Sequence, residues 1–172
     1  MDRNDSFREF VATHQRSLMR TAYLLTGDAH LAEDLLQSVL LKVLRRWPKH
    51  VASPQAYARK ALVNQYISWR RRPARAELPS AEPPEQSYSS EDSTVVKLAV
   101  RQALAQLPPR QRAVIILRYY EDLTEHETAK LLNCSIGTVK SHAHHAMARL
   151  RVLAPELAPK FAEVEALKEA HR

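Results

Sequence analysis

Glycine and cysteine are scarce in this chain, which has two glycines and one cysteine among 172 residues. Glycine commonly supplies the tight turns of a sheet protein, and a single cysteine excludes an internal disulfide bond. Runs of β-branched residues are few, whereas apolar residues recur at intervals of three and four along long stretches. With 45% hydrophobic residues, the chain can bury a core. We therefore predict an all-α fold.

Long apolar runs are also absent. No N-terminal stretch combines a charged start with an apolar segment of signal-peptide length, and no stretch is long enough to span a bilayer. No set of residues resembles a catalytic constellation. We expect a cytoplasmic protein without a membrane partner, which is not an enzyme and uses no cofactor.

Charge divides the sequence into three parts. Residues 1–72 hold 13 Lys and Arg against 6 Asp and Glu, and residues 94–172 hold 12 against 8. Residues 73–93 hold 1 against 5 and contain four prolines. Such a segment cannot bury enough apolar surface to fold, so we expect a flexible acidic linker between two small helical domains. Basic surfaces are typical of nucleic-acid binding, although many solvated surfaces are basic too.

The first domain, 1–72, carries the start and stop signals of three helices. One helix ends at Gly27, which suits a left-handed cap. Asp28 can cap a second helix over 29–47, and Ser53 can cap a third helix that runs until Pro73.

The second domain, 94–153, contains the strongest local signal, a helix-turn-helix. Thr124 and Glu127 have the spacing of a capping box. Asn133 follows the helix where a left-handed residue is expected, and Ser135 can cap a final helix that starts at Ile136 and ends near Leu153. Small Ala129 at the crossing, with Val139 and Met147 facing inward, completes the pattern.

The C-terminal tail, 154–172, gives a weaker signal. Phe161, Val164 and Leu167 keep helical spacing after Pro159, which is compatible with a short amphipathic helix.

The stretch 134–151 holds the only cysteine and three histidines, which raises the question of a zinc site. A structural zinc site needs four ligands, usually in two close pairs. No second cysteine is present, and His144 points roughly a hundred degrees away from His145, so that only His142 and His145 share a helix face. We predict no metal site, and we expect Cys134 to pack as a small apolar side chain in the turn.

The exposed face of the last helix suits a DNA major groove. Hydroxyls, the helix N-terminus and Lys or Arg suit phosphates, while His can donate or accept at base edges. The alternative is a solvated helix face. The residues predicted to contact DNA are Thr138, Lys140, Ser141, His142, His144, His145 and Arg149.

Both domains also resemble a known family. Region 4 of the extracytoplasmic-function sigma factors resembles "LPPRQRAVIILRYYEDLTEHETAKLLNCSIGTVKSHAHHAMARLR", and their region 2 resembles "AEDLLQSVLLKVLRRW" with "SPQAYARKALVNQYISWRRR". The two segments stand in the right order across roughly residues 5–153. "TAYLLTGDAHLAEDLLQ" with "VNQYISWRRR" is similar to the actinobacterial SigE-type branch.

The resemblance implies a dissociable initiation subunit that binds core RNA polymerase at its clamp and flap and directs promoter recognition, DNA opening and transcription initiation. Region 2 would be 1–72 and region 4 would be 94–153, which would bind the minus-35 element. The implied clamp contacts are Asp34, Leu35, Gln37 and Leu41. The implied minus-10 contacts are Arg59, Lys60, Asn64, Gln65, Ser68, Trp69, Arg70, Arg71 and Arg72. An anti-sigma factor is a further candidate partner.

Trp69 stands among arginines, and an aromatic ring beside guanidinium groups can stack on an unpaired base. Two positions depart from the family pattern. Ser38 stands where relatives usually carry an acid, and the stretch 142–145 replaces a face that usually holds arginine and a larger apolar residue. Neutral histidines should bind DNA more weakly than arginines.

Two other functions remain open at this point. "GTVKSH" also resembles the DNA-binding domain of LuxR-type regulators, although the first domain lacks the alternating strands of a receiver domain. A helical adaptor or anti-sigma-like binding protein would explain the amphipathic helices but not the basic, groove-facing helix.

Overall fold

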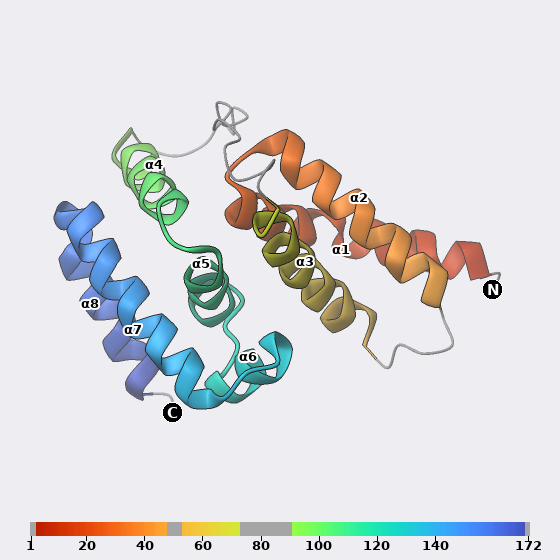
Figure 1. The fold of residues 1–172 in the computed structure, drawn as a ribbon. Coiled ribbons are helices and arrows are strands. Elements are labelled where there is room, and N and C mark those ends of the chain that lie inside the picture. The colour runs from red at the N-terminus through yellow and green to blue at the C-terminus, as the bar shows by residue number, and fades with distance from the viewer. Residues whose placement is uncertain (1–2, 48–52, 73–90, 171–172) are drawn as a thin grey trace. The chain divides into compact units, whose positions relative to one another are not determined.

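The computed structural model describes residues 3–47, 53–72 and 91–170. These residues form helices and turns and contain no strand, which confirms the predicted all-α fold. The chain divides into two compact units, Met1–Pro84 and Glu85–Arg172, which are described separately (Figure 1). No helix among the described residues is long and apolar enough to cross a membrane.

Unit 1 is a bundle of three helices, each of which packs on the other two. The helices are α1 (Arg3–Thr26), α2 (Ala29–Arg46) and α3 (Pro54–Arg70). Gly27 adopts a φ of 71°, the left-handed conformation predicted for it. The Asp28 carboxylate accepts a 2.9 Å hydrogen bond from the amide of Leu31 and caps α2, and Ser53 caps α3 in the same way.

An aromatic cluster joins the start of α1 to the end of α2. Trp47, at the end of α2, packs edge-on against Phe7 with ring centroids 5.5 Å apart and lies 5.2 Å from the ring of Phe10. Its indole Nε1 donates a 2.9 Å hydrogen bond to Ser6 Oγ. The start of α1 is therefore fixed against the end of α2.

Unit 2 holds the helix-turn-helix and two short elements that the sequence did not predict, a π-helical turn and a 3₁₀ turn. Its elements are α4 (Glu91–Ala105), α5 (Pro109–Ile115), a π-helical turn (Ile116–Tyr120), α6 (Glu125–Leu132), α7 (Ile136–Leu153), a 3₁₀ turn (Pro155–Leu157) and α8 (Ala158–Ala170). The π-helical turn was missed, as was the left-handed conformation of Asp122, with a φ of 58°. Helix α4 begins three residues before the predicted start at 94, and the rest of the predicted linker lies outside the described residues.

The helix-turn-helix forms as predicted. Both hydrogen bonds of the capping box between Thr124 and Glu127 are present. Asn133 ends α6 with a φ of 53°, and Ser135 caps α7 through a 3.0 Å bond from the amide of Thr138. Three small or apolar side chains are buried at the helix crossing as expected, namely Ala129, Val139 and Met147.

Candidate nucleic-acid interfaces

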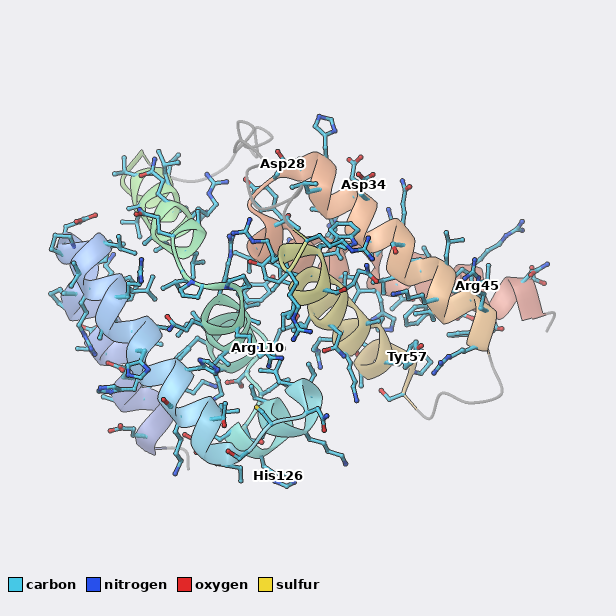
Figure 2. All side chains as sticks on the ribbon, in the orientation of Figure 1. Asp28, Asp34, Arg45, Tyr57, Arg110 and His126 are labelled. Atoms are coloured by element: carbon cyan, nitrogen blue, oxygen red, sulfur yellow. The ribbon has the colours of Figure 1, made fainter. Side chains whose placement is uncertain are left out.

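An open cleft of about 570 Å³ lies between the C-terminal half of α2 and α3. Figure 2 labels Arg45 and Tyr57, one from each wall. The residues that line it are Lys42, Arg45, Arg46, Tyr57, Lys60, Ala61, Asn64, Gln65 and Ser68. The lining contains four cationic side chains, two amides and one aromatic ring, and no acidic residue. This cleft therefore has the charge and the hydrogen-bonding groups to hold a nucleic-acid strand.

Four of the predicted minus-10 residues lie together in this cleft. Lys60, Asn64 and Ser68 follow the four-residue spacing of one helix face, and Gln65 stands beside them on the next row. Lys42 Nζ donates a hydrogen bond to Gln65 Oε1, which holds the two helices' polar groups together across the cleft. The predicted set is thus partly clustered.

The other predicted minus-10 residues do not line the cleft. Helical spacing turns Arg59 and Arg70 roughly 200° away from Tyr57, toward the buried side of α3. Arg70 Nε is buried and has no hydrogen-bond partner among the described residues. Trp69 is half-buried, whereas Arg71 and Arg72 are exposed beyond the end of α3.

Sequence reasoning missed the α2 wall of the cleft. Lys42, Arg45 and Arg46 stand three and four residues apart near the end of α2, so helical spacing could have placed them beside one another. The guanidinium of Arg46 lies 5.7 Å from the centroid of the Tyr57 ring. This contact holds an aromatic ring next to a cation at one end of the cleft.

The predicted clamp contacts divide between the surface and the core. Asp34 and Gln37 are exposed on α2, and Leu41 is 55% exposed although it is apolar. Their spacing places all three on one helix face. Leu35 was wrongly assigned to this surface, because its side chain is fully buried in the core of unit 1. Its position, one residue after Asp34, turns it by roughly 100° onto the inner face.

The predicted DNA face of α7 is exposed or half-buried along its length. Ser141 and His145 lie at its centre, with His145 Nδ1 3.5 Å from Ser141 Oγ. The rings of His144 and His145 are 5.8 Å apart, so the two histidines are neighbours despite their different directions along the helix. No three His, Cys, Asp or Glu side chains within 3–47, 53–72 and 91–170 are grouped to hold a metal ion.

His142 is half-buried at the edge of this face. Burial lowers the pKa of His142 below its usual value of 6.5, and the charges of Arg110 and His145 lower it further. Arg110, at the start of α5, was missed as part of the face because it is distant in sequence (Figure 2). At neutral pH His142 is therefore an uncharged hydrogen-bonding group beside a permanent cation.

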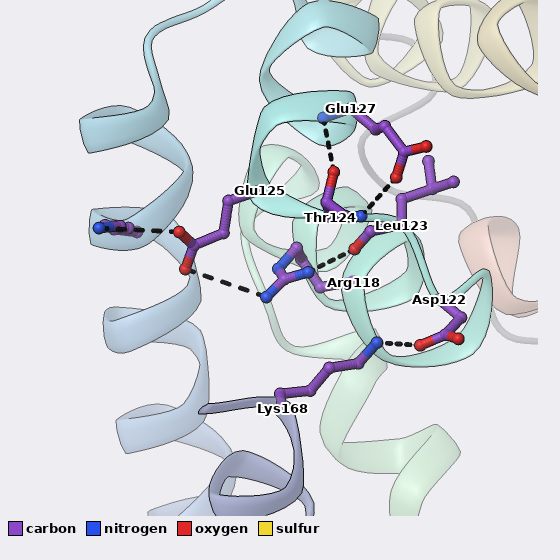
Figure 3. A network of polar contacts seen from close by, with 8 residues as sticks. Arg118, Asp122, Leu123, Thr124, Glu125, Glu127 and Lys168 are labelled. Carbon is purple, nitrogen blue, oxygen red and sulfur yellow. Dashed lines mark hydrogen bonds and ion pairs between the residues drawn. The ribbon is translucent and has the colours of Figure 1, made fainter. Parts of the chain in front are cut away.

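Arg118, Leu123 and Glu125 form a polar network, which Figure 3 shows. Lys140 of α7 joins this network. Its ammonium lies 3.7 Å from the carboxylate of Glu125, which in turn lies 3.9 Å from the guanidinium of Arg118. Arg118 is buried and also donates to the carbonyl oxygen of Leu123. The network connects the π-helical turn to α6 and α7, and it partly neutralises the charge that Lys140 would present to DNA.

Comparison with known proteins identifies both units. A family described as Sigma-70 region 2 matches residues 10–76, and one described as Sigma-70, region 4 matches residues 97–150. The RNA polymerase sigma-E factor of Streptomyces avermitilis is 36% identical over 171 residues, which cover 96% of this chain and 93% of that protein. The chain is an extracytoplasmic-function sigma factor of the sigma-70 family.

Further relatives agree with this assignment of the sigma factor. The ECF RNA polymerase sigma factor SigL of Mycobacterium tuberculosis is 35% identical over 159 residues, which cover 87% of this chain and 89% of that protein. The solved sigma factor RpoE from Bartonella quintana, in complex with the anti-sigma factor NepR, superposes with a TM-score of 0.68 at 25% identity, over 86% of this chain and 96% of that one. The two matched regions stand in order along this sigma factor, which favours neither a LuxR-type regulator nor a helical adaptor.

Proposed function

We propose that this sigma factor reads promoter DNA with two separate surfaces, the α2–α3 cleft in unit 1 and the exposed face of α7 in unit 2. The observation that carries this proposal is the cleft itself, in which four cationic side chains and an aromatic ring gather without an acidic residue. Residues 1–72 would serve core polymerase and the minus-10 element, 73–93 would link the units, and 94–153 would bind the minus-35 element, followed by the tail 154–172.

The cleft suits an unpaired DNA strand. Lys42, Arg45 and Lys60 can hold phosphates, and Asn64 can hydrogen-bond a base edge. The ring of Tyr57, held by Arg46, offers a stacking surface. Exposed Arg71 and Arg72 can add phosphate contacts beyond the end of α3. Because Arg59, Trp69 and Arg70 lie away from the cleft, the proposal depends less on them.

The α7 face suits duplex DNA. Ser141 and His145 stand at its centre, where His145 can donate or accept at a base edge. Arg149 stands one helical turn after His145, and Arg110 lies near enough to His142 for its charge to act on that residue, so both arginines can hold phosphates beside this face. His142 contributes as a neutral group, and Lys140 contributes less because Glu125 pairs with it.

The exposed face of α2 suits a protein partner rather than DNA. Asp34 is an acid close to the exposed apolar side chain of Leu41, and Gln37 lies between them. An acid and an apolar anchor on one face are the features of a specific protein contact. We assign this face to core RNA polymerase.

The sigma factor would act as a specificity subunit and would catalyse no reaction itself, in the cytoplasm where the polymerase works. An anti-sigma factor is a further proposed partner, since the similar sigma factor RpoE of Bartonella quintana is solved in complex with one.

Co-purification with core RNA polymerase tests this function. The purified chain should assemble with core polymerase and should bind promoter duplexes weakly alone, because polymerase converts two weak contacts into one avid contact. Tight, sequence-specific binding by the free chain without polymerase association would contradict the proposal.

A further inference from the structure

Helix α8 lies beside α7 and extends unit 2 beyond the region matched to Sigma-70, region 4 (Figure 1). Its start is anchored by Ala154 and Leu157, whose side chains are buried. No side chain of α8 itself is buried, and Val164 and Leu167 are exposed. The helix therefore covers unit 2 without contributing to its core.

Two ion pairs join α8 to the rest of unit 2. Glu165 pairs with Arg151 of α7, and Lys168 pairs with Asp122 in the turn that precedes α6. Figure 3 shows Lys168 reaching this turn. The second pair is the more informative one, because it joins the C-terminal helix to residues that lie 46 positions earlier in the chain.

The turn held by Lys168 is the entrance to the helix-turn-helix. Asp122 has a left-handed φ of 58°, a conformation that costs free energy for residues other than glycine. The carbonyl oxygen of Leu123 accepts from Arg118, and Thr124 caps α6. Glu125 then links α6 to Lys140 on α7. Hydrogen bonds and ion pairs therefore connect the turn at Asp122 to both helices of the helix-turn-helix.

The attachment of α8 is weak by construction. A 13-residue helix is marginal in water when it is isolated, so its order depends on its contacts. The Lys168 side chain is 19% exposed, but that of Asp122 is 84% exposed, and ion pairs that are open to solvent are individually weak and screened by salt. The buried anchor at Leu157 keeps the start of α8 in place while its far end can detach.

We propose that α8 is a releasable strap and that Lys168, acting through Asp122, is a positioning residue for the turn before α6. The strap is closed at low ionic strength and opens as salt screens its ion pairs. Its effect on α6 and α7 is a property of unit 2, whereas its effect on promoter reading rests on the proposed minus-35 role of α7.

Amide hydrogen exchange on the full chain tests the strap. Lys168→Met keeps the apolar stem of the side chain but removes its charge, and Asp122→Asn removes the other charge while keeping a residue that tolerates a left-handed φ. Each variant should speed exchange by about two- to five-fold in the turn and at the start of α6. The double variant should exchange no faster than either single variant. Lys168→Arg keeps the positive charge and should exchange as slowly as the unmodified chain.

Lys160→Met provides the matched control, because Lys160 is exposed on the same helix. It should leave exchange in the turn unchanged, and 1 M salt should speed exchange in α8 of the unmodified chain. Additive effects of the two substitutions, or equal effects of Lys160→Met, would overturn the proposal.

A parallel assay separates this proposal from the proposed function. Lys168→Met should lower transcription by polymerase holoenzyme from a minus-35-dependent promoter by a similar two- to five-fold. Transcription from a promoter that depends on its minus-10 element alone should not change. Changed exchange together with unchanged transcription would keep the strap as a structural element but contradict its positioning role. Loss of all minus-35 dependence in the unmodified protein would contradict the proposed function and leave the exchange result intact.

Discussion

The guanidinium of buried Arg118 lies 3.9 Å from the carboxylate of Glu125 and also donates to the carbonyl oxygen of Leu123. Arg118 belongs to the π-helical turn, and Glu125 begins α6. One side chain thus fixes both the turn and the first helix of the helix-turn-helix. A charge buried in this way is tolerated because it is paired and hydrogen-bonded.

We predict that Arg118→Leu destabilises unit 2. The substitution leaves the carboxylate of Glu125 and the carbonyl of Leu123 without this donor, so the free energy of unfolding should fall by about 1.5–3 kcal/mol. Thermal and urea unfolding of the purified protein measure this loss. Arg149→Leu makes the same change at an exposed position of unit 2 and should alter stability by less than about 0.5 kcal/mol. Equal stability of the two variants would show that the network is dispensable.

The cleft predicts a salt-dependent contact with DNA. In holoenzyme, Lys60→Ala should weaken promoter binding and reduce the slope of log affinity against log salt by about 1, because one phosphate contact is lost. Arg8→Ala removes an exposed cation of α1 outside the cleft and should leave the slope unchanged. Titrations at several salt concentrations decide the matter, and an unchanged slope for Lys60→Ala would place the strand elsewhere.

The lowered pKa of His142 predicts a loss of stability in acid. As pH falls, the unfolded chain, with a histidine pKa of about 6.5, takes up a proton on His142 at a higher pH than the folded chain does. The contribution of His142 to stability is therefore complete above pH 6.5 and decreases as pH falls below it.

Two variants isolate this effect in melting curves between pH 8 and pH 5. His142→Gln should remove the His142 part of the acid loss, and Arg110→Gln should reduce it, since one charge that lowers the pKa of His142 is gone. Melting temperatures of His142→Gln that fall with pH as steeply as those of the unmodified protein would refute this assignment.

Local signals in the sequence were sufficient for the helices and their caps. Asp28, Ser53 and Asn133 act through neighbours within a few residues, so their roles could be read without a fold. The α2–α3 cleft could not be predicted in full, because its wall from α2 depends on how two helices pack. Leu35 is a different case, since Leu35, Val39 and Val43 follow the spacing of one apolar helix face and the sequence alone could have placed them in the core. The strap joins Asp122 to Lys168 by a contact that no periodicity encodes.

The exposed face of α2 predicts a charge-sensitive polymerase contact. Asp34→Lys should abolish assembly with core polymerase while the fold stays intact, because an exposed charge reversal costs little stability but opposes the partner's charge. Glu9→Lys makes the same reversal at an exposed position of α1 and should assemble normally. Pull-down with core polymerase, with circular dichroism as the folding check, gives the answer. Normal assembly of Asp34→Lys would move the interface away from this face.

In vitro transcription by reconstituted holoenzyme tests the central claim most directly, with promoters that differ only in the minus-35 or the minus-10 element. His145→Ala should lose about 1–3 kcal/mol of discrimination between minus-35 sequences and keep its minus-10 preference. Lys60→Ala should weaken initiation by the same factor at promoters that differ only in the minus-35 element. Initiation by core polymerase that does not depend on this chain, or His145→Ala with undiminished minus-35 discrimination, would contradict the account.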